Sequence, residues 1–376
     1  MVRTLLIAVV LLIVLTGCLY DSRELDHRSL IMGMAIEEGK EHLFSITIQL
    51  PVLTQGTETG TGPSAREFET FTAEADTLWD ALSELESVTP SILFFGHMKT
   101  VMISEAVAKE HLPKVLDLLA RESSVGSQVY LLVIEGSAKE FLQAESPLVS
   151  LPSLYVNRYF SSDQKLSRSQ GVKLYEYRRD SNTISNVATL PLAKIEDNVI
   201  KIQGMAFFKN DHLVEKLQGN LVGLSELMKE DRLDFMNYTT VVEDHKVNLS
   251  RIKLTQDVDF DETNPVQFHL KIKGKGEVIA IDDINKMIDN ELIDKINKKM
   301  EQEIKTDIEQ LINKLQQKNI EPWLMGQRIW GLNPSYFNKL KWEEEGWKNA
   351  QFTVDVKFNI TNTGQRDLFT KERKER

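Results

Sequence analysis

The chain has 376 residues, of which 41% are hydrophobic and 27% charged, and its formal net charge at pH 7 is -11. This length exceeds what one small core usually holds and predicts two or three domains. The acidic balance argues against a nucleic-acid partner, because no basic stripe is available to neutralise phosphates. An acidic body also gains little electrostatic attraction to anionic lipid headgroups.

The first residues have the parts of a bacterial lipoprotein export signal. Arg3 supplies a positive charge, and an apolar run of eleven residues follows from Leu5 to Leu15. A membrane-spanning helix needs about 20 residues, so this run predicts a cleaved signal core. The sequence Leu15-Thr16-Gly17-Cys18 matches the lipobox. We therefore predict a signal peptide over residues 1–17 and diacylglycerol on the thiol of Cys18.

Cys18 is the only cysteine, which excludes a disulfide framework. No second run of about 20 apolar residues occurs, so the lipid is the predicted attachment to the extracytoplasmic face of a membrane. About ten residues separate Cys18 from the first predicted strand. At ~3.3 Å per extended residue, the folded body is expected within about 35 Å of the membrane surface.

The N-terminal domain is predicted over residues 18–190 with a mixed α+β fold. Runs 29–37 and 42–50 predict a hairpin, and Asp76 is predicted to cap the helix that follows it. Two strand-like runs at 98–103 and 128–134 enclose a helical stretch with Pro113 in it, which predicts a βαβ unit with parallel strands. The weakly patterned segment 146–186 is expected to be long and exposed.

The C-terminal domain is predicted over residues 191–376, with a subdivision near residue 282 left open. Runs 199–208 and 213–217 predict a hairpin, and further alternating runs cover 244–259 and 266–281, which indicates an antiparallel sheet. The sequence Lys273-Gly274-Lys275-Gly276 lies inside such a run and indicates a bulge or a close backbone approach. An alternating strand over 350–361 closes the fold.

A long helix is predicted over residues 284–320, where neither Gly nor Pro occurs. Apolar residues recur at every fourth position from Ile284 to Ile312, so the stripe drifts ~40° per step around an ideal helix. Such a helix either winds across its partner surface or is interrupted and re-phased.

No pattern of catalytic or metal-binding residues stands out. The seven histidines are dispersed, without a His-Glu-x-x-His motif and without a cysteine partner for zinc. No Gly-x-Ser-x-Gly nucleophile turn is present. We therefore expect no enzyme activity, no cofactor and no metal.

Several segments together resemble the Ger(x)C family, the lipoprotein C subunits of spore nutrient-germinant receptors. Residues 20–26 follow the lipobox and are similar to the family's aromatic-Asp-x-Arg-Glu-Leu signature. Residues 94–105 resemble its Phe-Gly-His-x-Lys segment, and residues 204–214 resemble its Gly-x-Ala-x-Phe-Lys hairpin. The long helix, the segment from Trp323 to Trp330 and the closing strand also fall in family order.

The resemblance implies a role in a receptor complex. Family members assemble with two integral membrane subunits, A and B, in the spore inner membrane, and the complex starts germination in response to nutrients. The resemblance implies no catalytic residue. Phe95, Gly96, His97 and Lys99 form either a protein interface or a structural turn, and the turn is favoured because glycine-containing turns usually answer a backbone need.

Two other functions remain as alternatives from the residues alone. The first is a solute-binding lipoprotein of a transporter, whose lobes would be repeated βαβ units. The second is a lipid-anchored cell-wall hydrolase, which would show a cleft with paired carboxylates or a metal.

Overall fold

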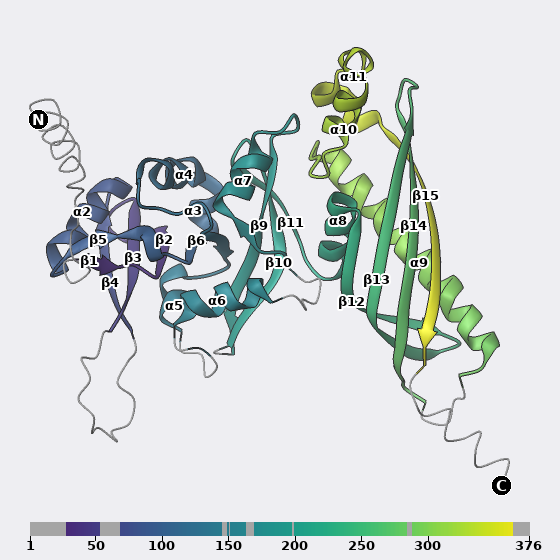
Figure 1. Ribbon diagram of the computed structural model, residues 1–376, viewed down its shortest axis with the longest axis horizontal. Helices are drawn as coiled ribbons and strands as arrows, with labels where there is room; N and C mark the ends of the chain where they lie inside the picture. Colours follow the sequence, from purple (N-terminus) through teal and green to yellow (C-terminus); the bar gives the residue numbers. More distant parts are fainter. Residues whose placement is uncertain are drawn as a thin grey trace, which may run out of the picture.

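The computed structural model describes residues 28–52, 68–144, 149, 151–162, 169–197, 199–283 and 288–363. Cys18, the predicted signal peptide and the last thirteen residues lie outside this part of the chain. The described residues form a nine-stranded and a four-stranded sheet, with a two-stranded pairing at one end (Figure 1). The predicted mixed α+β fold is confirmed. Figure 1 shows the N-terminal part and the C-terminal part side by side along the longest axis.

The nine-stranded sheet belongs to the N-terminal part and has a parallel centre. Its order is β11-β10-β9-β7-β6-β2-β3-β4, with β8 paired to β7. Strands β2, β6, β7 and β9 run parallel to one another, and the outer pairs are antiparallel. The strands are β2 (Gly33–Glu38), β3 (Phe44–Pro51), β4 (Phe68–Ala75), β6 (Thr100–Ser104), β7 (Tyr130–Ile134), β8 (Val172–Lys173), β9 (Val187–Glu196), β10 (Val199–Lys209) and β11 (His212–Leu217).

The predicted hairpin and the predicted βαβ unit are both present. Strands β2 and β3 pair in antiparallel register. Strands β6 and β7 are parallel and are joined by α3 (Glu105–Glu110) and α4 (Leu112–Arg121), with Pro113 in the first turn of α4. Proline is tolerated there because the first-turn amides have no partner within the helix.

Helices cover both faces of this sheet, so its central strands are buried on both sides. In β7, Leu131 and Leu132 are neighbours in sequence and lie in two different hydrophobic cores. Residues of α2, α3, α4 and α7 pack in the first core, and residues of α5 and α6 pack in the second. The remaining helices of this part are α2 (Leu78–Val88), α5 (Ala138–Gln143), α6 (Pro152–Ser161) and α7 (Leu174–Ser181).

Two predictions for this part are wrong. The cap of α2 is Thr77, whose hydroxyl accepts a hydrogen bond from the Asp80 amide at 3.1 Å, whereas Asp76 accepts from the Leu43 amide. The segment 146–186, expected to be exposed, contains α6 and α7, and Val156 and Tyr177 in these helices are fully buried. Their apolar positions are too few for the helical period to stand out in the sequence.

Strands β9, β10 and β11 carry the sheet past residue 190, where the domain boundary was expected. Asn210 and Asp211 have φ values of 51° and 60° in the turn of the β10–β11 hairpin, which confirms that predicted hairpin. Ala206 packs in the N-terminal core, while Phe207 packs in the core of the C-terminal part. A division at residue 190 would therefore cut through β9. The position of the domain boundary stays a prediction.

The C-terminal sheet has the order β12-β13-β14-β15, and α9 packs on one face of it. The first three strands are antiparallel, and β15 is parallel to β14. The elements are β12 (Arg232–Val242), β13 (His245–Asp261), β14 (Gln267–Ile281), β15 (Gln351–Asn362), α8 (Asn220–Glu230), α9 (Asn290–Gln317), α10 (Met325–Leu332), α11 (Pro334–Leu340), α12 (Trp347–Asn349) and the π-helical turn η4 (Trp342–Gly346).

The long helix is shorter than predicted and is uninterrupted. It begins at Asn290, where Asp289 accepts a hydrogen bond from the Leu292 amide at 2.8 Å, and it ends at Gln317. Residues 284–287 lie outside the described chain. Every fourth residue from Leu292 to Ile308 is buried, so the drifting stripe follows the sheet across its length.

Two local features concern the β15 edge of this sheet and its packing against β14. The β15 amides of Phe358 and Ile360 donate to the side chains of Glu301 and Asn297 on α9, at 3.1 and 2.9 Å. These bonds satisfy part of an otherwise free strand edge. At Gly274, a Cβ atom would lie 2.5 Å from Cδ2 of Phe358, which confirms the predicted close approach.

Candidate functional site

The predicted interface segment lies where the described chain begins. Strand β1 (Arg28–Leu30) pairs in parallel with β5 (Ile92–Phe94), and the short 3-10 helix η3 (Phe95–His97) follows β5 directly. The guanidinium carbon of Arg28 lies 4.6 Å from the centre of the Phe94 ring, and the Ile31 amide donates to the Phe94 carbonyl at 3.0 Å. The segment is therefore fixed beside the first described residues, at the end of the molecule marked β1 and β5 in Figure 1.

The four candidate residues of this segment have different environments. Phe95 is buried, and its amide donates to the Ser124 hydroxyl at 3.3 Å. Gly96 is exposed, but a Cβ atom there would lie 2.5 Å from Cζ of Phe94. The Lys99 backbone connects the start of β2 with the start of β7. Its amide donates to the Met32 carbonyl at 2.8 Å, and its carbonyl accepts from the Tyr130 amide at 2.9 Å.

The fourth residue, His97, is the exposed side chain of this turn. Its ring lies edge-on to the Phe94 ring, with 6.0 Å between ring centres. Val88 and Ile92, at the end of α2 and the start of β5, are 53% and 48% exposed. These two apolar residues were missed from the sequence, where an apolar residue at a strand or helix end gives no sign of its exposure. The crowding at Gly96 comes from the Phe94 ring, and both roles of the segment, a structural turn and a contact through His97, remain predictions.

A second candidate site is the junction between the two parts of the chain. Glu321, just after α9, is buried, and its carboxylate accepts hydrogen bonds from the amides of Trp323 at 2.8 Å, Met325 at 3.0 Å and Gly326 at 3.4 Å. Ser185, which precedes β9, donates its hydroxyl to the same carboxylate. Burial raises the pKa of Glu321, and these hydrogen bonds oppose the shift. Each carboxylate oxygen has partners, so Glu321 has a structural role at the junction.

Charged contacts add to the junction on both sides of Glu321. Glu215 of β11 pairs with Lys318 at 2.7 Å, and Lys229 of α8 pairs with Asp180 of α7 at 2.5 Å. Burial raises the pKa of Glu215, but the hydrogen bond from Lys318 and the other lysine contacts together lower it by more than burial raises it. The net shift of this pKa is therefore downward. Strand β10 contributes residues to both hydrophobic cores, and together with these contacts it holds the two parts together.

A cavity of about 280 Å³ opens at this junction. Its lining comes from both parts of the chain and combines polar side chains with two tryptophans: Ser185, Asn186, Lys209, Asn210, Asn319, Glu321, Trp342, Glu343, Glu344 and Trp347. The Lys209 ammonium donates to the Asn319 carbonyl at 2.5 Å, and burial lowers the pKa of Lys209. Lys209 and Asn319 thus bond to each other, whereas the indole Nε1 atoms of Trp342 and Trp347 are buried and have no hydrogen-bond partner among the described residues.

Among the described residues, no group of three His, Cys, Asp or Glu side chains is placed to hold a metal ion. Within the same ranges, no helix has both the length and the apolar character needed to cross a bilayer.

Comparison with known proteins defines the class of this protein. The family model described as the spore germination protein N-terminal domain matches residues 21–195. The model described as spore germination B3/GerAC like, C-terminal, matches residues 203–364. The chain therefore belongs to the Ger(x)C family of spore germination proteins, as the sequence segments predicted.

Individual relatives agree with this assignment. The putative spore germination protein YfkR of Bacillus subtilis is 24% identical and is covered over 91% of each chain. Spore germination protein B3 of the same organism is 22% identical over 94% of this chain and 96% of its own. The solved GerBC protein is 19% identical, with a TM-score of 0.55 over 88% of this chain and 97% of that chain, and so shares the fold.

The two alternatives from the sequence find no support. The C-terminal part is a mostly antiparallel sheet, with β15 parallel to β14, and one long helix. It is not a second lobe of repeated βαβ units, as a solute-binding lipoprotein of a transporter would have. The family models that match belong to spore germination proteins and not to cell-wall hydrolases.

Proposed function

We propose that this chain is the lipid-anchored, non-catalytic C subunit of a spore germinant receptor, required for nutrient-triggered germination. In this role diacylglycerol on Cys18 holds the protein on the extracytoplasmic face of the spore inner membrane. The folded body contacts the integral membrane A and B subunits and stabilises their assembly. Its relatives are named as spore germination proteins, which supports the role.

One observation carries the proposal. Arg28 is held against Phe94, and the turn with Gly96 and His97 lies directly beside it. Arg28 is the tenth residue after Cys18, and this stretch spans at most about 35 Å when extended. A lipid on Cys18 would therefore keep this turn near the bilayer, with the exposed Val88 and Ile92 at the same end.

The anchor is tested by Cys18→Ala, with Ser22→Ala as the control that leaves the lipobox intact. We expect the Cys18 variant to leave the membrane fraction of spores and to slow germination strongly, because one covalent lipid group supplies most of the membrane affinity. The Ser22 variant should behave like the wild type. A Cys18→Ala protein that stays in the membrane fraction and supports normal germination would refute the anchor.

A contact through the turn with Gly96 and His97 is tested separately by His97→Ala, with His212→Ala, at another exposed histidine, as a matched control. We expect the His97 variant to reduce co-purification of the A and B subunits from spore membranes, while the His212 variant leaves it unchanged. Equal co-purification by both variants contradicts a contact through His97 and leaves the anchor untouched.

The non-catalytic role has its own test. The purified protein should leave purified peptidoglycan intact over hours at the pH of germination. Clearing of the peptidoglycan would show that the chain is a hydrolase.

A further inference from the structure

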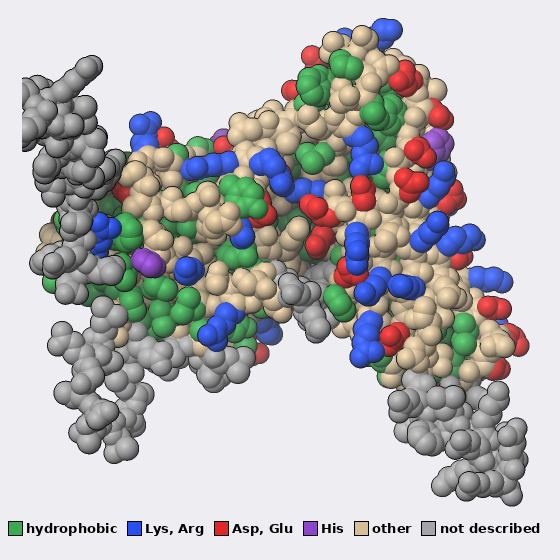
Figure 2. Space-filling model, in the orientation of Figure 1, with side chains coloured by type: hydrophobic (Ala, Val, Ile, Leu, Met, Phe, Trp, Pro, Cys, Tyr) green, Lys and Arg blue, Asp and Glu red, His purple; other side chains and the backbone are tan. Residues whose placement is uncertain are grey.

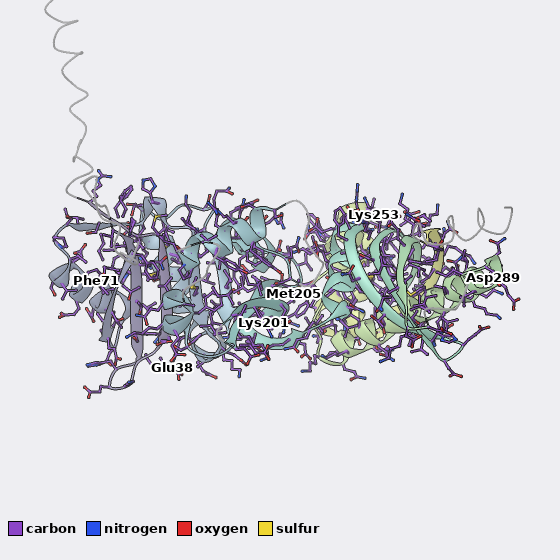
Figure 3. The ribbon with its side chains drawn as sticks, turned by 90° about the horizontal axis from the view of Figure 1, so that it is seen from below. Glu38, Phe71, Lys201, Met205, Lys253 and Asp289 are labelled. Atoms are coloured by element: carbon purple, nitrogen blue, oxygen red, sulfur yellow. The ribbon has the colours of Figure 1, made fainter. Side chains whose placement is uncertain are left out.

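The outer face of the C-terminal sheet turns away from α9 and is open to solvent. Along β13, Ile252 and Leu254 point into the core beneath the sheet, and Lys253 between them points outward. Figure 3 labels Lys253, whose side chain extends from the sheet on the side away from the core. Strands β14 and β15 alternate in the same way, with lysines at outward positions.

Strand register brings four of these lysines together. Lys253 of β13 lies directly opposite Lys275 of β14, and Lys273 of β14 lies directly opposite Lys357 of β15. In the antiparallel β13–β14 pair, side chains at such opposite positions have Cβ atoms about 4.5–5.5 Å apart. Strands β14 and β15 are parallel neighbours, and adjacent strands of a sheet lie about 4.7–4.9 Å apart. We call Lys253, Lys273, Lys275 and Lys357 the lysine patch. Figure 2 shows Lys and Arg side chains gathered over the middle of this face.

The adjoining row on the same face is arranged differently. There Lys271 lies between Asp257 of β13 and Asp355 of β15, so opposite charges alternate across the strands. Lys271 also pairs with Asp259 at 3.6 Å. Beyond the patch in the other direction, Arg251 pairs with Glu277 at 2.7 Å. The patch is therefore a band of positive charge between an acid-rich row and an ion-paired row.

The lysines of the patch are poorly neutralised within the described chain. Lys253 pairs with Asp234 at 3.5 Å, and Lys357, 84% exposed, reaches Glu301 only at 3.9 Å. Lys273 and Lys275 have no ion pair among the described residues. Like charges directly opposite one another destabilise a sheet. A band that costs stability, on a protein of net charge -11, indicates that the lysines serve a contact with something else.

We propose that the lysine patch is a docking surface for an acidic segment of a partner protein. Complementary charge steers such contacts and selects the partner. A protein segment fits better than an anionic membrane, because a flat lipid surface would also meet Asp257, Asp259 and Asp355 on the same face. This proposal goes beyond the lipid anchor, since it depends only on the charge pattern of the C-terminal sheet.

The test uses the mature chain, residues 18–376, with Cys18→Ser so that no lipid is attached. The probe is a fluorescent peptide of sixteen alternating Glu and Asp residues, and anisotropy is measured at 0.02 and 0.15 M salt. The patch variant is Lys273→Glu, Lys275→Glu and Lys357→Glu combined. The control variant changes the same net charge at exposed lysines elsewhere, with Lys40→Glu, Lys298→Glu and Lys339→Glu combined.

We expect the patch variant to bind the peptide at least about tenfold more weakly than wild type, and the control variant to change affinity much less. Binding should also weaken at the higher salt concentration. Equal losses in both variants, or no binding of the peptide by the wild type at 0.02 M salt, overturn the proposal. Both variants should keep the wild-type circular dichroism and melting temperature, which excludes unfolding as the cause of a loss.

A parallel measurement separates the membrane from a protein partner. The same three proteins are sedimented with vesicles of phosphatidylglycerol and phosphatidylcholine. Binding to the vesicles that is lost in the patch variant, without binding to the peptide, would overturn the proposal in favour of a lipid surface. Failure here leaves the Cys18 anchor test unaffected, because that test follows membrane fractionation of the lipidated protein.

Discussion

The two sheets of this molecule are buried in different ways. The N-terminal sheet has helices on both faces, so consecutive residues of β7 are all buried. The C-terminal sheet has its helix on one face only, so β14 and β15 alternate between buried and exposed positions. Parallel central strands covered on both sides read as continuous apolar runs, and one-sided antiparallel strands read as alternation.

This difference determines where each part can meet other molecules. The N-terminal sheet has no open face at its centre, so its contacts must use turns and ends such as the segment from Phe94 to His97. The C-terminal sheet offers a whole polar face with an uneven charge pattern. The first surface lies near the predicted anchor and the second lies at the other end of the long axis (Figure 1).

The largest effects should come from the buried strands. We expect Leu131→Ala and Leu132→Ala each to lower the free energy of unfolding by about 2–5 kcal/mol, because each side chain fills a different core. In β14, Leu270→Ala should cost a similar amount, but the neighbouring Lys271→Ala should stay within about 0.5 kcal/mol. Urea unfolding measures all four. A small effect of Leu132→Ala would show that one face of the N-terminal sheet is open.

A large effect is also expected at the junction between the two parts. Glu321→Ala leaves three buried amides without an acceptor and should cost on the order of 3 kcal/mol or more. Glu321→Gln keeps one acceptor oxygen and should cost less. The exposed Glu343→Ala serves as control and should change stability little. If all three variants unfold at the same urea concentration, Glu321 does not hold the junction.

The Glu321 carboxyl also predicts a pH dependence of stability. Burial raises its pKa in the folded protein above the unfolded value of about 4.3. Its contribution to stability is therefore fully present below that unfolded value and is lost as the pH rises through the folded pKa. Between pH 4 and pH 8, the free energy of unfolding of the wild type should fall relative to that of Glu321→Gln. Parallel curves for the two proteins would contradict the raised pKa.

The smallest effect concerns the lysine patch. Lys273→Glu places a carboxylate opposite Lys357 and should raise the free energy of unfolding by about 0.2–1 kcal/mol. The control Lys271→Glu places a third acid between Asp257 and Asp355 and should lower it by a similar amount. Urea unfolding at low salt measures both. The same sign for both variants would mean that the register does not set the charge balance of this face.

Several features were determined by the sequence alone, because they depend on neighbours along the chain. Alternation of apolar and polar residues over 350–361 predicted β15, and the absence of Gly and Pro from 284–320 predicted α9. The Asn210-Asp211 turn predicted the β10–β11 hairpin, since such residues tolerate the left-handed conformation. The order of several segments along the chain, among them those around Gly96 and Gly204, predicted the family.

Other features were decided only by the tertiary structure. Ser185 and Glu321 are 136 residues apart and meet because β10 contributes residues to the cores of both parts. The lysine patch depends on the register of β15 against β14, two strands separated by α9 and its following helices. Such register is set by packing against α9 and not by any local signal. The sequence could therefore predict the strands but not which of their charges would face one another.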